Sequence, residues 1–264
     1  GVFRVTSPTA VPAGVGTLAV TIDGHPAVVI DENVERIAVT NAVDYFAVTD
    51  AEAVARRNAV AIDRCNDCHN QLSIHGNNRT DEPEVCAVCH NPNATDINRR
   101  AGECAAELGT DDAPIDMKYM IHAIHAGGAT GMPYEACGFG NSPHVFDFVY
   151  PGKLNNCEGC HLPDEYYPVE ANEIHGTTID VGGDAASPTD DTVISPNTAV
   201  CSTCHVSDLA RKHMTQNGGD FEATKAADSA LISSGVETCA LCHGPGGSAD
   251  VVEVHGVEQF REIN

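Results

Sequence analysis

The sequence predicts a small N-terminal all-β domain, residues 1–61, followed by a larger domain of short α-helices and loops, residues 62–264. Two observations predict this division. Residues 1–61 contain no cysteine and show the apolar–polar alternation of strands. All 12 cysteines follow, in sequence rich in Asn, Asp, Gly, Pro and Thr. Only 5% of residues are aromatic and none is Trp, so the polypeptide alone has little material for a core.

The N-terminal segment reads as four or five short strands. Alternation at Leu18, Val20 and Ile22 predicts the first, and Asp23 to Pro26 forms a turn signal after it. Further strands are predicted over Ala27–Ile30, Arg36–Thr40 and Tyr45–Val48. So few strands are small for a closed sandwich, and we expect the sheet to leave an edge open.

The larger segment contains one motif, Cys-x-x-Cys-His, five times. The paired cysteines are Cys65 and Cys68, Cys86 and Cys89, Cys157 and Cys160, Cys201 and Cys204, and Cys239 and Cys242. The following histidines are His69, His90, His161, His205 and His243. Zinc knuckles and disulfide frameworks also use paired cysteines, but neither requires a His directly after every pair.

This motif is the attachment signature of c-type haem, in which each thiol forms a thioether and the His is the proximal iron ligand. We therefore predict five covalently attached haem c groups. The predicted fold class is a multihaem cytochrome c, with a small N-terminal all-β domain and a haem-packed domain of short α-helices and loops. Motif separations of 21, 71, 44 and 38 residues do not indicate a solenoid.

An iron with a proximal His has one further axial position, and its occupant separates electron transfer from small-molecule chemistry. Of 13 histidines, eight are not proximal. His75, His122, His125, His213 and His255 are the predicted distal ligands. His175, His144 and His25 are weaker candidates. His122 and His125 lie three apart on the clearest predicted helix, Ile115–Ala126, and their rings diverge enough to serve two irons.

Two cysteines, Cys104 and Cys137, remain outside the motifs, and a disulfide is their default in an oxidising compartment, with free thiols as the alternative. Val181–Asn197 reads as a loop. Its residues Asp184, Asp190 and Asp191 are compatible with calcium, although an ion-free surface loop is the simpler interpretation.

The net charge of −24 argues against nucleic acid and anionic membrane surfaces as partners and favours cationic or mineral ones. No apolar run is long enough to span a bilayer, so we expect no membrane span. Haem is attached to such motifs outside the cytoplasm, which predicts an exported protein whose signal was removed, or a fragment.

Several segments resemble the outer-membrane multihaem cytochromes of the OmcA/MtrC type from metal-reducing bacteria. These are Arg56 to His69, Ile74 to Arg79, Cys86 to Pro92, Met120 to Gly127 and Tyr150 to Leu154. The resemblance implies alternating β and pentahaem domains, bis-histidine ligation, and electron transport out of the cell to minerals. This chain has one such half where the family usually has two, a short β segment, and cysteines 104 and 137 within the haem region.

We therefore expect an extracellular or outer-membrane electron carrier, not an enzyme, with mineral or soluble acceptors and other multihaem cytochromes or identical subunits as partners. A sharper hypothesis is a polymeric cytochrome filament, in which an incoming strand pairs with the open β edge. The alternatives are a multihaem reductase of nitrite, tetrathionate or a similar small oxidant, and a soluble periplasmic electron shuttle or haem-storage protein.

Overall fold

The computed structural model describes residues 4–11, 13–14, 16–169, 173–184, 187–225 and 236–261, and the chain folds into two compact units. Unit 1 comprises residues 1–57 and 71–85, and unit 2 comprises 58–70 and 86–264. The division 1–61 and 62–264 stays a prediction.

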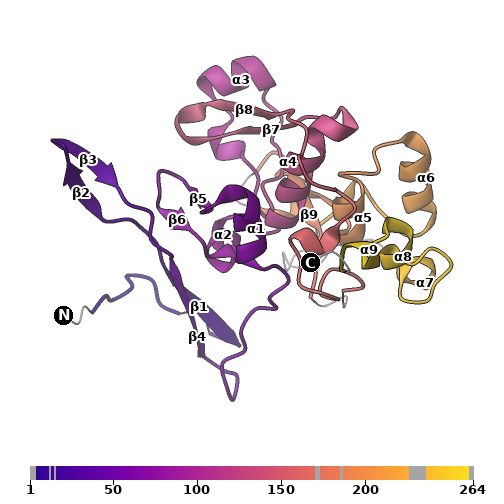
Figure 1. The fold of residues 1–264 in the computed structure, drawn as a ribbon, viewed down its shortest axis with the longest axis horizontal. Coiled ribbons are helices and arrows are strands. Elements are labelled where there is room, and N and C mark those ends of the chain that lie inside the picture. The colour runs from indigo at the N-terminus through magenta and orange to yellow at the C-terminus, as the bar shows by residue number, and fades with distance from the viewer. Residues whose placement is uncertain are drawn as a thin grey trace. The chain divides into compact units, whose positions relative to one another are not determined.

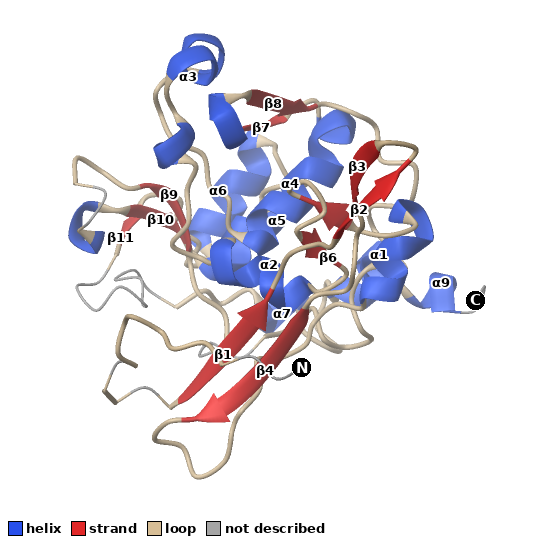
Figure 2. Cartoon of the chain, turned by 90° about the vertical axis from the view of Figure 1, so that its left-hand side faces the viewer, coloured by secondary structure: helices blue, strands red, loops and turns tan. Residues whose placement is uncertain are grey.

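Unit 1 is built from three separate antiparallel pairs of strands (Figure 1). Its strands are β1 (Thr17–Ile22), β2 (Ala27–Ile30), β3 (Asn33–Arg36), β4 (Ala42–Ala47), β5 (Ser73–Ile74) and β6 (Arg79–Thr80). β1 pairs with β4 and β2 with β3 (Figure 2), and β5 pairs with β6. The β-rich prediction is correct, but the strand predicted over residues 36–40 is wrong, because β3 ends at Arg36.

Two of these two-stranded sheets carry apolar side chains opposite one another. Leu18 and Phe46 are opposite one another in the β1–β4 pair, and Val29 and Val34 in the β2–β3 pair. Val29 and Val34 are 72% and 70% exposed. A two-stranded sheet has two edge strands and two faces, which explains why its apolar side chains lack cover.

Unit 2 consists of short helices joined by loops and small sheets. Its helices are α1 (Ile62–His69), α2 (Pro83–Cys89, which begins in unit 1), α3 (Gly102–Leu108), α4 (Met117–Thr130), α5 (Pro196–Cys201), α6 (Asp208–Gln216), α7 (Ala240–His243), α8 (Val251–His255) and α9 (Glu258–Arg261). Its 3-10 helices are η1 (Ile97–Arg99), η2 (Phe139–Asn141), η3 (Cys157–Gly159) and η4 (Pro188–Asp190). Its strands are β7 (Tyr134–Cys137), β8 (Pro143–Phe146), β9 (Thr177–Asp180), β10 (Thr192–Ile194) and β11 (Ala223–Thr224).

The loop predicted over residues 181–197 is wrong in part. β10 lies within it, pairs with β9 and β11, and leads into α5, while residues 185–186 lie outside the described part. Val193 and Ile194 are buried there. Two apolar residues among polar ones are too short a signal to predict a strand whose neighbours are distant in sequence.

The apolar core formed by described residues is small. Its buried cluster is Ile194, Ala199 and Phe221, with Tyr119 and Met214 against it. A buried disulfide joins Cys104 to Cys137 with their Cα atoms 5.8 Å apart, in agreement with the sequence prediction. It connects α3 to β7 and adds a covalent constraint where apolar packing is sparse.

Candidate haem-binding sites

The five Cys-x-x-Cys-His motifs all lie on short helices or turns of unit 2. α1, α2 and α7 carry the first, second and fifth, η3 begins the third, and α5 ends at Cys201 of the fourth. In each motif after the first, the backbone N–H of the His donates to the carbonyl of the first Cys, at 2.9–3.0 Å. This one-turn geometry places two thiols and an imidazole at one end of a helical turn.

Four predicted proximal histidines each lie opposite a predicted distal histidine. The ring centroids are 6.2 Å apart for His69 and His125 and 5.9 Å apart for His161 and His122. They are 6.0 Å apart for both His205 with His255 and His243 with His213. A metal–imidazole bond is about 2 Å long, so two rings on opposite sides of one ion have centroids roughly 6 Å apart. The spacing therefore fits two axial ligands of one iron.

The relative ring orientation differs among the pairs. The His122 and His161 rings are nearly parallel, at 23°. The other three described pairs are close to perpendicular, at 76–88°. The pairs are thus alike in spacing but not in the electronic environment that the two imidazole planes impose on a metal.

Hydrogen bonds to backbone carbonyls orient six of the candidate ligands. Among proximal residues, Nδ1 of His90, His161 and His243 lies 2.7, 3.0 and 2.9 Å from the carbonyls of Ile115, Ala59 and Ala249. Nδ1 of His122, His125 and His255 lies 2.5, 2.8 and 2.9 Å from the carbonyl four residues earlier. A carbonyl can only accept, so Nδ1 carries the proton and Nε2 keeps the lone pair that binds a metal.

Burial favours the neutral form of the candidate histidine ligands. Burial lowers the pKa of His122 and of His205, which keeps the imidazoles neutral and able to bind iron.

The cysteine thiols of different motifs affect one another. Burial raises the pKa of the Cys65 thiol to about 11, with a smaller contribution from Cys160. For Cys201 burial, followed by Cys239, raises the pKa to about 12. Thiols of the first and third motifs, and of the fourth and fifth, therefore lie near each other.

Large apolar side chains beside the candidate ligands are uncovered by polypeptide. Leu209 on α6 is 78% exposed, and Leu241, two residues before His243, is 80% exposed. Val88, Val206 and Val254 are also exposed. Apolar groups at these places fit a porphyrin plate lying against them. Together with the paired rings, they indicate that the residues present fit haem c.

The remaining predicted histidines lie elsewhere. His75 belongs to unit 1, on the turn between β5 and β6, with φ of +52° followed by Gly76 at +67°. Its role as a distal ligand stays a prediction. The His144 ring stacks on Phe146, and a Cβ at Gly138 would lie 2.3 Å from its Nε2, so His144 is packed against backbone.

Two weaker candidates have simpler surroundings. Nδ1 of His25 lies 3.3 Å from the carbonyl of Pro26 in unit 1. His175 lies two residues before β9. Neither is among the histidine pairs described above.

The acidic residues considered for calcium are engaged in the fold. Asp191 accepts from Lys225 Nζ at 2.8 Å, and Asp190 accepts from the N–H of Asp184 at 3.1 Å. Among the described residues, no group of three or more His, Cys, Asp or Glu side chains is arranged to hold a metal ion. In the same part of the chain, no helix is both long and apolar enough to cross a membrane.

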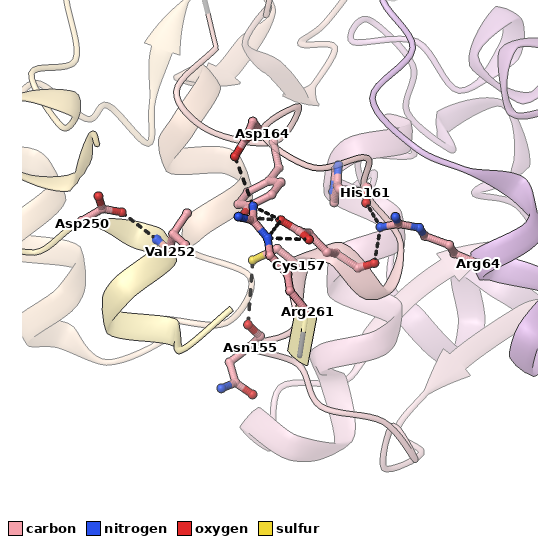
Figure 3. A network of polar contacts seen from close by, with 10 residues as sticks. Arg64, Asn155, Cys157, His161, Asp164, Asp250, Val252 and Arg261 are labelled. Carbon is pink, nitrogen blue, oxygen red and sulfur yellow. Dashed lines mark hydrogen bonds and ion pairs between the residues drawn. The ribbon is translucent and has the colours of Figure 1, made fainter. Parts of the chain in front are cut away.

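Sequence reasoning missed the polar groups that fasten the motifs to one another. Arg64 Nη1 donates to the carbonyls of Glu158 and His161, and Arg261 donates to the Glu158 carboxylate through Nε at 2.9 and 3.0 Å (Figure 3). Asn155 Nδ2 donates to the carbonyl of His255 at 2.7 Å. Arg64 stands directly before the first motif and could have been noticed in the sequence. Its partners could not be predicted, because they lie about a hundred residues away.

A known protein family matches most of the chain. The family described as "Outer membrane cytochrome MtrC/MtrF-like, domains II/IV" matches residues 57–256. Comparison with curated proteins finds no match.

Two solved structures are similar over part of their length. The outer membrane decaheme cytochrome OmcA is 22% identical with a TM-score of 0.47, covering 95% of this chain and 36% of that one. MtrC from Shewanella baltica OS185 is 18% identical with a TM-score of 0.39, covering 86% of this chain and 26% of that one. The chain thus spans about a third and a quarter of their lengths.

Proposed function

The chain belongs to the MtrC/MtrF-like outer membrane cytochrome family, and we propose that it carries electrons along five bis-histidine haem c groups to acceptors outside the cell. Membership of this family assigns it to the outer-membrane or extracellular surface. A bound haem c exchanges one electron between ferric and ferrous iron, and no substrate is otherwise transformed.

The pairing of histidines carries this proposal. Each of four motif histidines has a second histidine at ligand spacing, so the protein supplies both axial groups. Such a site holds an iron without offering it to a small substrate, which favours electron transfer over the reduction of nitrite or a similar oxidant. His90, oriented by Ile115, completes the set of proximal ligands.

Backbone contacts support an order for the motifs in space. The first and third lie side by side, because Ala61 N–H donates to Cys160 and Leu162 N–H donates to Ala59. The second is held to the start of α4, where Met117 N–H donates to His90 at 2.9 Å. We place these three motifs around α4.

The fourth and fifth motifs form a second group. Each proximal His pairs with the distal His that follows the other motif: His205 with His255, and His243 with His213. The Asn155–His255 hydrogen bond connects the third motif to this group. The proposed path for electrons therefore connects the three motifs around α4 with the fourth and fifth motifs, and the third motif is the point of connection.

Mass and spin state test the proposal together. The intact protein should have the mass of the polypeptide plus five haems, and its ferric form should be entirely low spin by electron paramagnetic resonance. His125→Ala should convert one haem in five to high spin, because it removes one distal ligand. His144→Ala is the matched control and should change nothing. A haem-free mass, or a high-spin haem in the unaltered protein, would contradict the proposal.

Polymerisation is a second proposal, favoured by the exposed apolar strands of unit 1. β2 and β3 form a sheet of their own with Val29 and Val34 on one exposed face, so a strand or sheet of an identical subunit could bury them. Electron microscopy of the purified protein should show filaments, and Val34→Glu should abolish them. Monomers at high concentration by light scattering would rule polymerisation out.

A further inference from the structure

The strongest unexplained feature of unit 2 is a cation placed between two haem attachment segments. Arg64 lies directly before Cys65 of the first motif. Its guanidinium donates to the carbonyls of Glu158 and His161, which both belong to the third motif (Figure 3). Arg64 is half-buried. The Arg64 charge therefore lies beside both motifs. It is next to the first motif in sequence, and hydrogen bonds hold it to the third.

The Arg64 charge has no carboxylate partner in the described structure. The Asp63 carboxylate accepts from the backbone N–H of Arg64 at 3.0 Å, and the Glu158 carboxylate binds Arg261, which donates to both of its oxygens through Nε. Arg261 also pairs with Asp164 at 3.2 Å. The third motif thus has Arg261 with two carboxylates on one side and the Arg64 guanidinium on the other.

The position of Arg64 determines how strongly its charge acts at the third motif. Its side chain is half-buried and is hydrogen-bonded to two carbonyls of that motif. A charge held in this way is screened less by solvent than the charge of an exposed surface cation.

We propose that Arg64 is a positioning residue that raises the reduction potentials of the haems held by the first and third motifs. This inference rests on the proposed function. Reduction of ferric iron removes one positive charge, so a nearby cation destabilises the oxidised form more than the reduced form. The same guanidinium holds the His161 carbonyl, so it also fixes the two motifs against each other.

Potentiometric titration of the full five-haem protein tests this. Arg64→Gln removes the charge and retains one donor, and it should move two of the five one-electron components to more negative potentials. Arg64→Lys keeps the charge and should leave both nearly in place. Lys153→Gln is the matched control, since Lys153 is an exposed cation four residues before Cys157 whose charge is screened by solvent.

Electron paramagnetic resonance identifies which haems move. The relative orientation of two imidazole planes sets the rhombic splitting at a low-spin ferric iron. The nearly parallel His122 and His161 pair should therefore give a signal distinct from the perpendicular pairs. In Arg64→Gln this signal should disappear at a more negative potential than in the unaltered protein.

The possible outcomes separate this inference from the proposed function. Arg64→Gln protein with five low-spin haems could show potentials that are unchanged or that all move equally. Either result would overturn the role of Arg64 and leave the proposed function intact. Fewer than five haems in the unaltered protein would overturn the proposed function. If Arg64→Gln fails to retain its haems, Arg64→Lys decides, because a negative shift despite the retained charge would refute the electrostatic role.

Discussion

The buried carboxylate of Asp96 accepts hydrogen bonds from three residues. It accepts from Arg100 Nε at 3.0 and 2.9 Å, from Ala113 N–H at 2.7 Å, and from Cys137 N–H at 2.6 Å. The Arg100 and Asp96 side chains are 4% and 1% exposed. A buried carboxylate is tolerated only when it is fully paired in this way.

Asp96→Asn should therefore destabilise the protein strongly. The change leaves the Arg100 charge buried without a counter-ion and removes an acceptor, which costs about 3–5 kcal/mol in the free energy of unfolding. Chemical denaturation followed by circular dichroism measures it. Asp147→Asn, at an exposed aspartate, should change stability by less than about 0.5 kcal/mol. Equal effects of the two substitutions would show that the Asp96 network is energetically unimportant.

Asp112 should make the free energy of unfolding depend on pH in the direction opposite to that of an ordinary paired carboxylate. Burial raises its pKa, and its Oδ2 is buried with no hydrogen-bond partner among described residues. The folded protein thus binds this proton more tightly than the unfolded chain. The free energy of unfolding should fall as pH rises from the ordinary aspartate pKa through the raised one.

Asp112→Asn should abolish that fall and leave the protein more stable at neutral pH. Thermal unfolding at several pH values between 3 and 7 measures the effect, and Asp111→Asn, at the exposed neighbour, is the control. A destabilised Asp112→Asn protein at pH 7 would mean that the ionised carboxylate has a partner that stabilises it.

At the residue scale, the sequence indicated candidate ligands more readily than the groups that orient them. His122 and His125 could be proposed as ligands because helical spacing puts them on neighbouring faces. The carbonyl four residues before each was also predictable once the helix was. The carbonyl of Ala59 that orients His161 was not, because it is 102 residues away and no side chain marks it.

Among the elements, α5 depends on a side chain from a distant segment. Its N-terminal N–H groups, on Asn197 and Thr198, both donate to Glu237 at 2.8 Å, and Ser195 and Thr198 hydroxyls donate to the same carboxylate at 2.6 and 2.7 Å. Glu237 therefore caps the helix that ends in the fourth motif, although it lies two residues before the fifth.

Glu237→Gln should loosen both motifs at once. An amide must turn its NH2 toward donors, so part of the cap is lost, at a cost of about 1.5–3 kcal/mol. Hydrogen exchange should show faster opening of both α5 and α7. Glu222→Gln, at an exposed glutamate, is the control. Faster exchange confined to α7 would contradict a cap shared between the motifs.

The same elements show where sequence-based prediction stops. The α4 helix was predicted to within a few residues because its apolar residues repeat at helical spacing. β10 was missed because its stability comes from β9 and β11, which are brought together with it only by the fold.

On the scale of the whole molecule, the net charge of −24 should govern which acceptors are reduced quickly. Electron transfer to an anionic soluble acceptor should accelerate as ionic strength rises, whereas transfer to a cationic one should slow, because salt screens repulsion and attraction alike. Stopped-flow kinetics of the reduced protein measures both, with an uncharged acceptor as control. The opposite trend for the anionic acceptor would indicate a local basic contact site that outweighs the net charge.

The division into the two compact units has no signature in composition. A change in cysteine content marks residue 61, but residues 71–85 pack with the N-terminal strands, through the bonds from Asn41 to Thr80 and from Gly24 to Asn78. Backbone hydrogen bonds of this kind carry no residue-type signature, so composition could not reveal them.

The sharing of α4 between two histidine pairs has a consequence for biogenesis. In chain order, His69 comes long before His125, and His161 comes after His122. With the ligation proposed above, neither coordination sphere could close until the fourteen-residue helix α4 has formed, and that helix would then close both. Maturation of the first and third cofactors should therefore be a single concerted event, and a defect in this helix should leave a protein with two immature centres.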